Sequence, residues 1–134
     1  MDILEIYQKL LQIATEKFGD VVEYGEILLT ESGEPLKLRL NIIDGSIIDI
    51  FFSVKGKYSF HWERREINGT IYRHDNASHR RWRGIKTFPK HFHNGSEENG
   101  RESYLSNSPV IAIEEFLRFV RQKLIEKIRG DDKP

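Results

Sequence analysis

The feature that most constrains the fold is a two-residue alternation of apolar and polar side chains in the middle of the chain. Apolar residues occupy every second position over residues 36–42, 48–54 and 58–62. This period is typical of strands that bury one face. Glycine-containing pairs that favour hairpin turns follow these segments: Asp44-Gly45, Lys55-Gly56 and Asn68-Gly69. The pattern predicts an antiparallel meander.

The register of the first two hairpins follows from keeping the apolar side chains together. We expect Leu40 to pair with Ile50, and Ile50 with Trp62, because these pairings hold every large apolar residue on one face. The pairings require odd-numbered loops, as in three-residue hairpins with a glycine bulge. The expected loops are Asp44-Gly45-Ser46 and Lys55-Gly56-Lys57.

The turn at Asn68-Gly69 decides which side chains share the other, polar face. A two-residue loop with strict pairing gathers these residues there: Ser59, His61, Glu63, Arg65, Tyr72 and His74. A bulge in the strand that follows this turn would reverse the facing of Tyr72 and His74. The sequence leaves this alternative open.

Both ends of the chain carry apolar stripes of helical period. The first stripe begins at Ile3, where Asp2 and Glu5 fit a capping box, and stops before Gly19. The second follows Ser108-Pro109, which fits an N-cap and first helical position, and ends near residue 130.

Two further segments complete the predicted architecture. Residues 21–29 form a weaker strand pattern, and residues 77–107 are polar and predict a long loop of the kind that is usually functional or mobile. The result is an α+β domain over residues 1–130, with an N-terminal helix, an antiparallel meander of about five strands and a C-terminal helix. Both helices pack on one sheet face. Residues 131–134 are expected to be a disordered tail.

Composition excludes several classes of protein. The chain has no cysteine, which excludes disulfides, thiolate chemistry and cysteine-ligated zinc. No apolar run is long enough for a membrane span, and the N-terminus does not resemble a signal peptide, so we expect a cytoplasmic protein without membrane contact. The net charge is zero, but residues 61–93 hold eight Arg or Lys and three acidic residues, together with all five histidines. This basic window is where a function is expected.

The densest group of reactive side chains in this window is Asp75, His79, His91 and His93. Imidazoles on a basic background suit metal-free RNA cleavage, in which one takes the proton of the 2′-hydroxyl and another protonates the leaving 5′-oxygen. We predict His79 and His91 as the acid–base pair, His93 and His61 as supporting residues, and Asp75 as the group that orients an imidazole. Single loop histidines are usually only solvated, and Asp75 with Asn76 also fits a plain strand end.

Phosphate and base contacts are assigned to neighbouring residues. Arg73, Arg80, Arg81 and Lys90 are predicted to hold phosphates, since Arg and Lys stabilise the charged phosphorane. Tyr72 and Trp82 lie among these cations and are the candidates for base stacking. The alternating aromatic residues over 58–62 are expected to be core.

Two other functions compete with metal-free catalysis. His91-x-His93 on an extended segment projects both rings to one side, and His79 or Asp75 could complete a metal site of a metal-dependent nuclease. This spacing is permissive, so we predict no metal and no cofactor. The other alternative is a nucleic-acid- or protein-binding module whose histidines are structural.

The motifs resemble those of the TumE family of toxin–antitoxin toxins. The resemblance spans nearly the whole chain and is carried by these motifs: Asp44-Gly45-Ser46, Tyr58-x-Phe60-His61, Asp75-Asn76-Ala77-x-His79, Thr87-Phe88-Pro89-x-His91-x-His93 and Ala112-Ile113-Glu114-Glu115-Phe116-Leu117. The family pattern falls on His61, Asp75, Asn76, His79, Pro89, His91 and His93. Residues 78–84 are more basic than the family pattern, which fits either substrate binding or a local insertion.

The resemblance implies a small type II toxin encoded beside a helix-turn-helix antitoxin. It also implies ribonuclease action on single-stranded or ribosome-bound messenger RNA. A helix followed by an antiparallel meander is similar to the compact fold of several toxin ribonucleases, although a fold does not determine a function.

Overall fold

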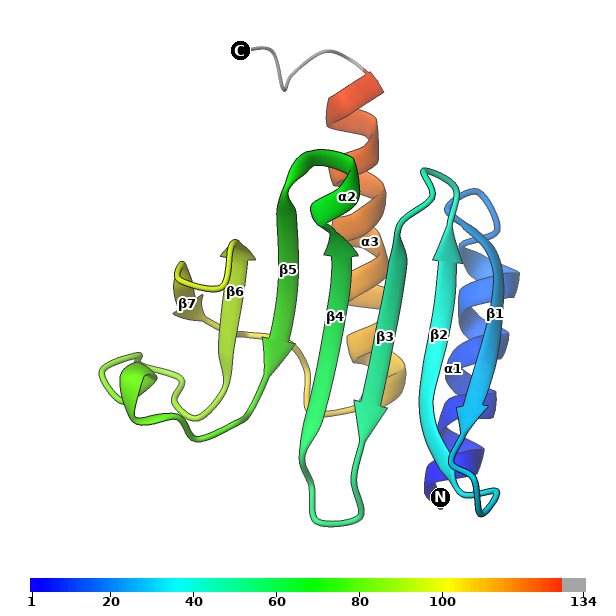
Figure 1. The fold of residues 1–134 in the computed structure, drawn as a ribbon, viewed down its shortest axis with the longest axis horizontal. Coiled ribbons are helices and arrows are strands. Elements are labelled where there is room, and N and C mark those ends of the chain that lie inside the picture. Colours follow the sequence, from blue (N-terminus) through cyan, green and yellow to red (C-terminus); the bar gives the residue numbers. More distant parts are fainter. Residues whose placement is uncertain (129–134) are drawn as a thin grey trace.

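The computed structural model describes residues 1–128 and contains one seven-stranded antiparallel sheet with two long helices (Figure 1). The strands follow one another in space as they do in the sequence. The elements are α1 (Ile3–Lys17), β1 (Val22–Leu29), β2 (Pro35–Ile42), β3 (Ile47–Phe52), β4 (Tyr58–Arg64), α2 (Arg65–Asn68), β5 (Thr70–Asp75), the 3-10 turn η1 (Arg80–Trp82), β6 (His91–Gly95), β7 (Gly100–Glu102) and α3 (Pro109–Ile128). The predicted tail, residues 131–134, lies outside the described residues.

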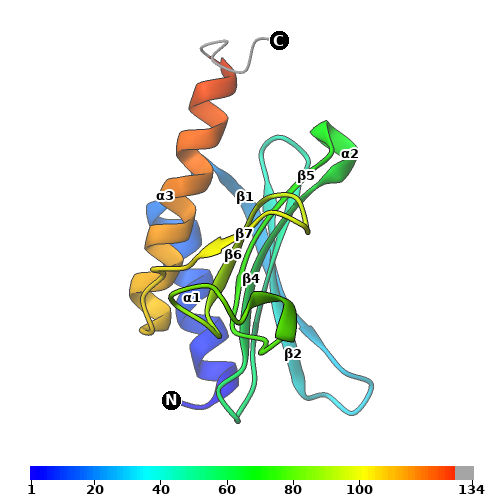
Figure 2. The same cartoon turned by 90° about the vertical axis from the view of Figure 1, so that its left-hand side faces the viewer.

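Both long helices lie on the same face of the sheet, as Figure 2 shows. Helix α1 packs against β1, β2 and α3, while the aromatic side chains of α3 meet those of the central strands, as in the edge-to-face contact of Phe116 with Phe60. This one-sided burial confirms the predicted α+β class and the placement of the helices. No long helix within residues 1–128 covers the opposite face, which we call the open face.

The number of strands is seven, so the prediction of about five was wrong. Strands β6 and β7 lie inside the segment 77–107 that was predicted to be a loop. In β6, only Phe92 among the first three residues is apolar, and β7 is three residues long and begins with Gly100. Neither strand carries the apolar alternation by which the others were recognised.

The predicted register of the first hairpins was wrong by two residues. Leu40 pairs with Ile48 and Ile50 with Phe60. Each three-residue loop begins one residue earlier than predicted and ends at Gly45 or Gly56, both at φ 89°. Glycine is needed there because the third loop position adopts the left-handed conformation. A shift of two residues leaves every side chain on its predicted face.

The connection between β4 and β5 is a helical turn, so the predicted two-residue loop was wrong. Helix α2 occupies residues 65–68, and Arg64 pairs with Thr70 across a five-residue connection. Tyr72 and His74 therefore face the helices. The reversal that the sequence left open is what occurs, and it places Arg73 and Asp75 on the open face beside His61.

A polar network secures the β2–β3 turn to the core. Asp44 accepts hydrogen bonds from the backbone and hydroxyl of Ser46, and Ser46 Oγ accepts one from Trp62 Nε1 at 2.7 Å. Asp44 also accepts from the guanidinium of Arg64 at 3.0 Å. The Arg64 side chain is only 3% exposed and lies over the Trp62 ring. The Asp44-Gly45-Ser46 motif is thus structural.

Replacing Asp44 by Asn should destabilise the fold because it leaves the buried Arg64 cation without its carboxylate. We expect a loss on the order of 2 kcal/mol in the free energy of unfolding at pH 7, measured by urea denaturation. Asp20→Asn is the matched control, since Asp20 pairs with Arg121 at the surface and is 57% exposed.

The effect of Asp44→Asn should depend on pH. Burial raises the pKa of Asp44, but hydrogen bonds from Ser46 and Arg64 outweigh it and hold the pKa below its usual 3.8. A lowered folded-state pKa contributes stability above the unfolded-state value, and this stability disappears as pH falls through the folded-state value. The difference in the free energy of unfolding between wild type and Asp44→Asn should therefore become smaller below pH 3.8. A gap that stays constant into this acid range would contradict the assignment.

Candidate active site on the open face

The open face carries a row of polar side chains that runs across the middle strands. Register places Asp49 opposite His61, His61 opposite Arg73, and Arg73 opposite His93. The four residues come from the adjacent strands β3, β4, β5 and β6. Because residues paired directly across two strands lie side by side, their side chains are within contact distance. The row combines two imidazoles with a central guanidinium, which is the combination predicted for phosphate chemistry.

Arg73 is the centre of this group and bonds to residues on both sides. Its guanidinium donates to Nδ1 of His61 and to Nε2 of His93, both at 3.2 Å. It also donates to Asp75 Oδ2 at 3.0 Å and to both carboxylate oxygens of Glu97. Burial alone would lower the pKa of Arg73, but Glu97 and Asp75 raise it, so the guanidinium stays charged. Arg73 is half-buried and its donors have fixed directions.

Asp75, His91 and His93 form a second group beside Arg73, which we call the triad. All three are buried, and each offers one ligand atom within 4.8 Å of the others. His91 Nε2 lies 3.2 Å from Asp75 Oδ1, and His93 Nε2 lies 3.7 Å from Asp75 Oδ2. Burial and the Arg73 charge lower the pKa of His93, although the Glu97 backbone opposes this shift, so the His93 ring is neutral at pH 7.

Two carboxylates outside the predicted set help to hold the cluster. Glu63 lies 3.1 Å from Nε2 of His61, and Glu97, in the β6–β7 turn, binds Arg73. The Arg73 guanidinium holds the pKa of Glu97 below its usual range. Glu97 lies beyond the basic window 61–93, and only the β6–β7 hairpin brings this carboxylate back to Arg73.

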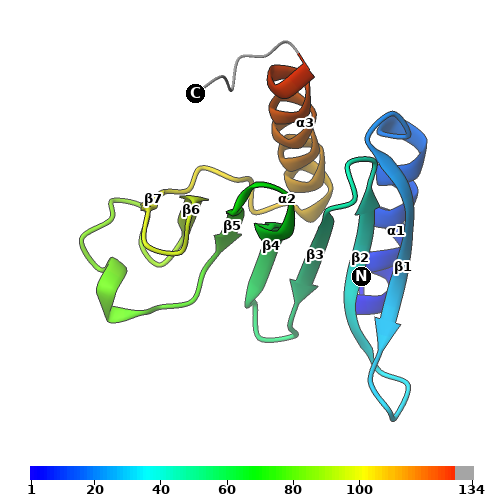
Figure 3. The same ribbon diagram turned by 45° about the horizontal axis from the view of Figure 1, so that its top comes forward.

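Trp82 covers the triad from the segment that joins β5 to β6. Its ring stacks on His91 at a centroid distance of 5.7 Å and meets His93 edge-on at 5.5 Å. Arg81 also lies over the Trp82 ring, with its guanidinium carbon 4.6 Å from the ring centroid. Figure 3 shows this segment looping out beyond β6 before it returns. The basic run at 78–84 thus lies next to the cluster.

The structure brings five of the predicted residues together, namely His61, Arg73, Asp75, His91 and His93. His79 is exposed, and no side-chain hydrogen bond or ion pair joins it to the cluster within residues 1–128. Asp75 lies against His91 and His93 instead of His79 or His74.

The remaining predicted residues lie elsewhere. Tyr72 is 8% exposed and packs in the core against Trp62 and Phe119. It does not offer a ring to a base, because the five-residue connection turned it towards the helices. Arg80 and Arg81 are exposed on η1. Lys90 donates to the Leu105 carbonyl and to the Asn107 side chain.

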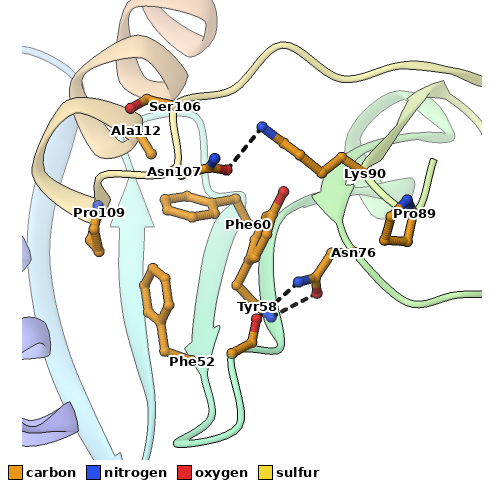
Figure 4. A pocket seen from close by; sticks show the side chains of 11 residues that line it. Phe52, Tyr58, Phe60, Asn76, Pro89, Lys90, Ser106, Asn107, Pro109 and Ala112 are labelled. Atoms are coloured by element: carbon orange, nitrogen blue, oxygen red, sulfur yellow. Dashed lines mark hydrogen bonds between the residues drawn. The ribbon is translucent and has the colours of Figure 1, made fainter. Parts of the chain in front are cut away.

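A separate cavity of about 400 Å³ lies on the helix side of the sheet (Figure 4). Its lining is mainly apolar and includes Phe52, Tyr58 and Phe60, with Lys90 at one side. Asn76 accepts from the Tyr58 backbone at 3.0 Å and donates to the Gly56 carbonyl at 2.9 Å. Asn76 therefore fastens the β3–β4 hairpin to the end of β5. None of the triad residues lines this cavity.

Replacing Gly100 by Ala should displace Trp82 from the triad. An added Cβ would lie 2.2 Å from a Trp82 ring carbon, so the ring must move. Trp62 is fully buried, so increased acrylamide quenching of tryptophan fluorescence would report on Trp82. Gly84→Ala, in the β5–β6 connection that carries Trp82, is the control, because nothing lies within 4 Å of its Cβ position. Equal quenching in the two variants would contradict this packing.

No helix within residues 1–128 is long and apolar enough to span a membrane.

Comparison with known proteins places the chain in one family. Searches of curated proteins and of solved structures found no match. The family model described as Toxin TumE matches residues 10–124, which include every strand and the whole open-face cluster. The chain therefore belongs to the TumE toxin family, and membership implies a cognate antitoxin as its partner.

Proposed function

We propose that this toxin is a cytoplasmic endoribonuclease of a type II system, neutralised by a helix-turn-helix antitoxin. The observation that carries the proposal is the position of Arg73, a half-buried guanidinium with an imidazole on either side. RNA cleavage needs an anion-stabilising donor and two proton-transfer groups at one phosphate. The open face holds these groups within one network.

Arg73 is the group that would stabilise the phosphorane. A phosphate oxygen can replace Glu97 on the guanidinium, because both are anionic acceptors for the same N–H donors. Glu97 is 43% exposed, so it can be displaced without opening the core. The exchange would keep the Arg73 bond to Asp75, which fixes the direction of the guanidinium.

Proton transfer would occur on the two sides of Arg73. The 2′-oxygen attacks phosphorus and the bond to the 5′-oxygen breaks, which leaves a 2′,3′-cyclic phosphate and a 5′-hydroxyl. His61 would donate a proton to the 5′-oxygen from Nδ1 after the Arg73 guanidinium turns to the phosphate, and the Glu63 carboxylate, 3.1 Å from Nε2, would hold the ring in place. The triad would supply the acceptor for the 2′-hydroxyl proton. This assignment replaces the predicted pair of His79 and His91.

Expression of the chain should arrest growth and fragment cellular RNA, and co-expression of the neighbouring antitoxin should relieve both effects. The fragments should carry the 2′,3′-cyclic phosphate and 5′-hydroxyl ends that the reaction produces. Arrest with intact RNA would refute the endoribonuclease and favour a toxin that acts by binding another target.

Arg73→Lys and His61→Gln should reduce cleavage while the protein stays folded. Lysine keeps the charge but loses the forked donors, and glutamine can still accept from Arg73 but cannot exchange a proton. We expect a loss of about 10²-fold or more for each, measured on a fluorogenic RNA. Arg118→Lys, on the exposed surface of α3, is the control. Full activity in both folded variants would remove Arg73 and His61 from the mechanism.

Arg80 and Arg81 should contribute to RNA affinity through phosphate contacts. The double variant Arg80→Gln with Arg81→Gln should bind RNA more weakly at low salt. Affinity for RNA decreases as salt increases, and the magnitude of the slope of log affinity against log salt should be smaller by about 1.4 in the double variant. This corresponds to roughly 0.7 for each lost phosphate contact with single-stranded RNA. A slope that does not change would show that these arginines do not touch phosphate.

A further inference from the structure

We infer that Asp75, His91 and His93 bind a divalent transition-metal ion. The inference rests on the geometry of these three side chains and does not require that the protein cleave RNA. Their ligand atoms lie within 4.8 Å of one another on the open face, with two histidines from β6 and the carboxylate from the end of β5. Two imidazoles and one carboxylate form a common three-residue metal site with open positions.

The two imidazoles are already oriented as metal ligands are. His91 Nδ1 donates to the Pro89 carbonyl and His93 Nδ1 donates to the Glu97 carbonyl, each at 2.9 Å. A ring that donates from Nδ1 in its neutral form keeps its lone pair on Nε2. Both Nε2 atoms face the carboxylate of Asp75. Backbone carbonyls in this role are typical partners of metal-binding histidines.

His91 Nε2 is the atom that most needs a partner. The residue is fully buried, and this nitrogen has no hydrogen bond, although Asp75 Oδ1 lies 3.2 Å away. A lone pair opposite a carboxylate oxygen is unfavourable unless a cation lies between them. Metal bonds of about 2.0–2.1 Å place neighbouring ligand atoms roughly 3.0–3.4 Å apart, and the 3.2 Å separation falls in this range.

The carboxylate of Asp75 is held in place before any ion arrives. Its Oδ1 accepts from the Ala77 backbone at 2.9 Å, and its Oδ2 accepts from Arg73 Nε at 3.0 Å. An ion would displace one hydrogen bond, from Arg73 to His93 Nε2, while Arg73 keeps its bonds to Glu97. Binding of an ion therefore requires little rearrangement of the side chains around the triad.

Ion pairs of opposite charge surround the triad on the open face. Three carboxylates, of Glu63, Asp75 and Glu97, face two guanidinium groups, of Arg65 and Arg73. These five ionised side chains sum to one negative unit, while Arg80 and Arg81 of the adjacent run 78–84 are positive and exposed. A divalent ion would reverse the sign of this sum and leave the cluster attractive to a phosphate.

The donor set indicates the class of ion. Imidazole nitrogen suits zinc, iron(II), cobalt(II) or nickel(II), while magnesium and calcium prefer oxygen ligands. Three protein ligands leave positions for water or substrate, as in catalytic sites. If the proposed function holds, an ion held by Asp75, His91 and His93 would supply the base for the 2′-hydroxyl proton, a role given above to the triad itself.

The experiment is a titration of chelator-treated protein with zinc chloride by calorimetry, and with cobalt(II) by visible absorption. We expect one ion per chain and no binding of magnesium. Asp75→Asn and His93→Gln should weaken zinc binding by at least about 10-fold, since even loss of a residue that only orients a ligand costs that much. His61→Gln is the matched control, because His61 also contacts Arg73 but lies outside the triad. Circular dichroism establishes that each variant is folded.

Three outcomes would overturn the metal site. These are no zinc or cobalt binding by the folded wild type, unchanged binding in both folded triad variants, or equal weakening by His61→Gln. Cleavage of RNA is scored separately, with chelator-treated protein and with the same protein reloaded with zinc. Zinc binding with no cleavage in either form would support the ion and refute the endoribonuclease. Cleavage by a folded protein that binds no metal would support the endoribonuclease and refute the ion.

Discussion

The structure depends on the burial of one face of a seven-stranded sheet beneath two helices. Apolar side chains at alternate positions of β2, β3 and β4 face α1 and α3, and removal of this surface from water is the main favourable contribution to folding. Because side chains alternate, the residues between them must share the open face. The polar cluster therefore exists as a geometric consequence of how the core is built.

Odd-numbered connections maintain this separation of faces. Two three-residue loops and one five-residue connection join β2 to β5, so the side-chain alternation stays in phase across the strands. The motifs that resemble those of the TumE family divide accordingly. Asp44 and Ser46 hold a turn and Asn76 holds a hairpin, while Asp75, His91 and His93 meet on the open face. These motifs thus include residues that hold the fold and residues of the candidate site.

The open-face cluster concentrates polar groups that are costly to bury without partners. Arg73 satisfies five acceptor atoms on His61, Asp75, His93 and Glu97, and this explains why several half-buried groups coexist there. His91 Nε2 is the exception that motivates the metal site. His74 shows the contrasting case on the helix face, where burial lowers its pKa to about 4 and Ser103 is its partner.

Local pattern determined much of this protein. Apolar periodicity and turn residues sufficed to predict both long helices, the first five strands and the packing of the helices on one sheet face, because these features follow from patterns among neighbouring residues. The window 61–93 also held five of the residues that meet in the cluster. Tertiary structure alone decided the facing of Tyr72, the strands β6 and β7, the return of Glu97 to Arg73 and the separation of His79 from the triad. These depend on the length of one connection and on pairing between distant segments, which no local period encodes.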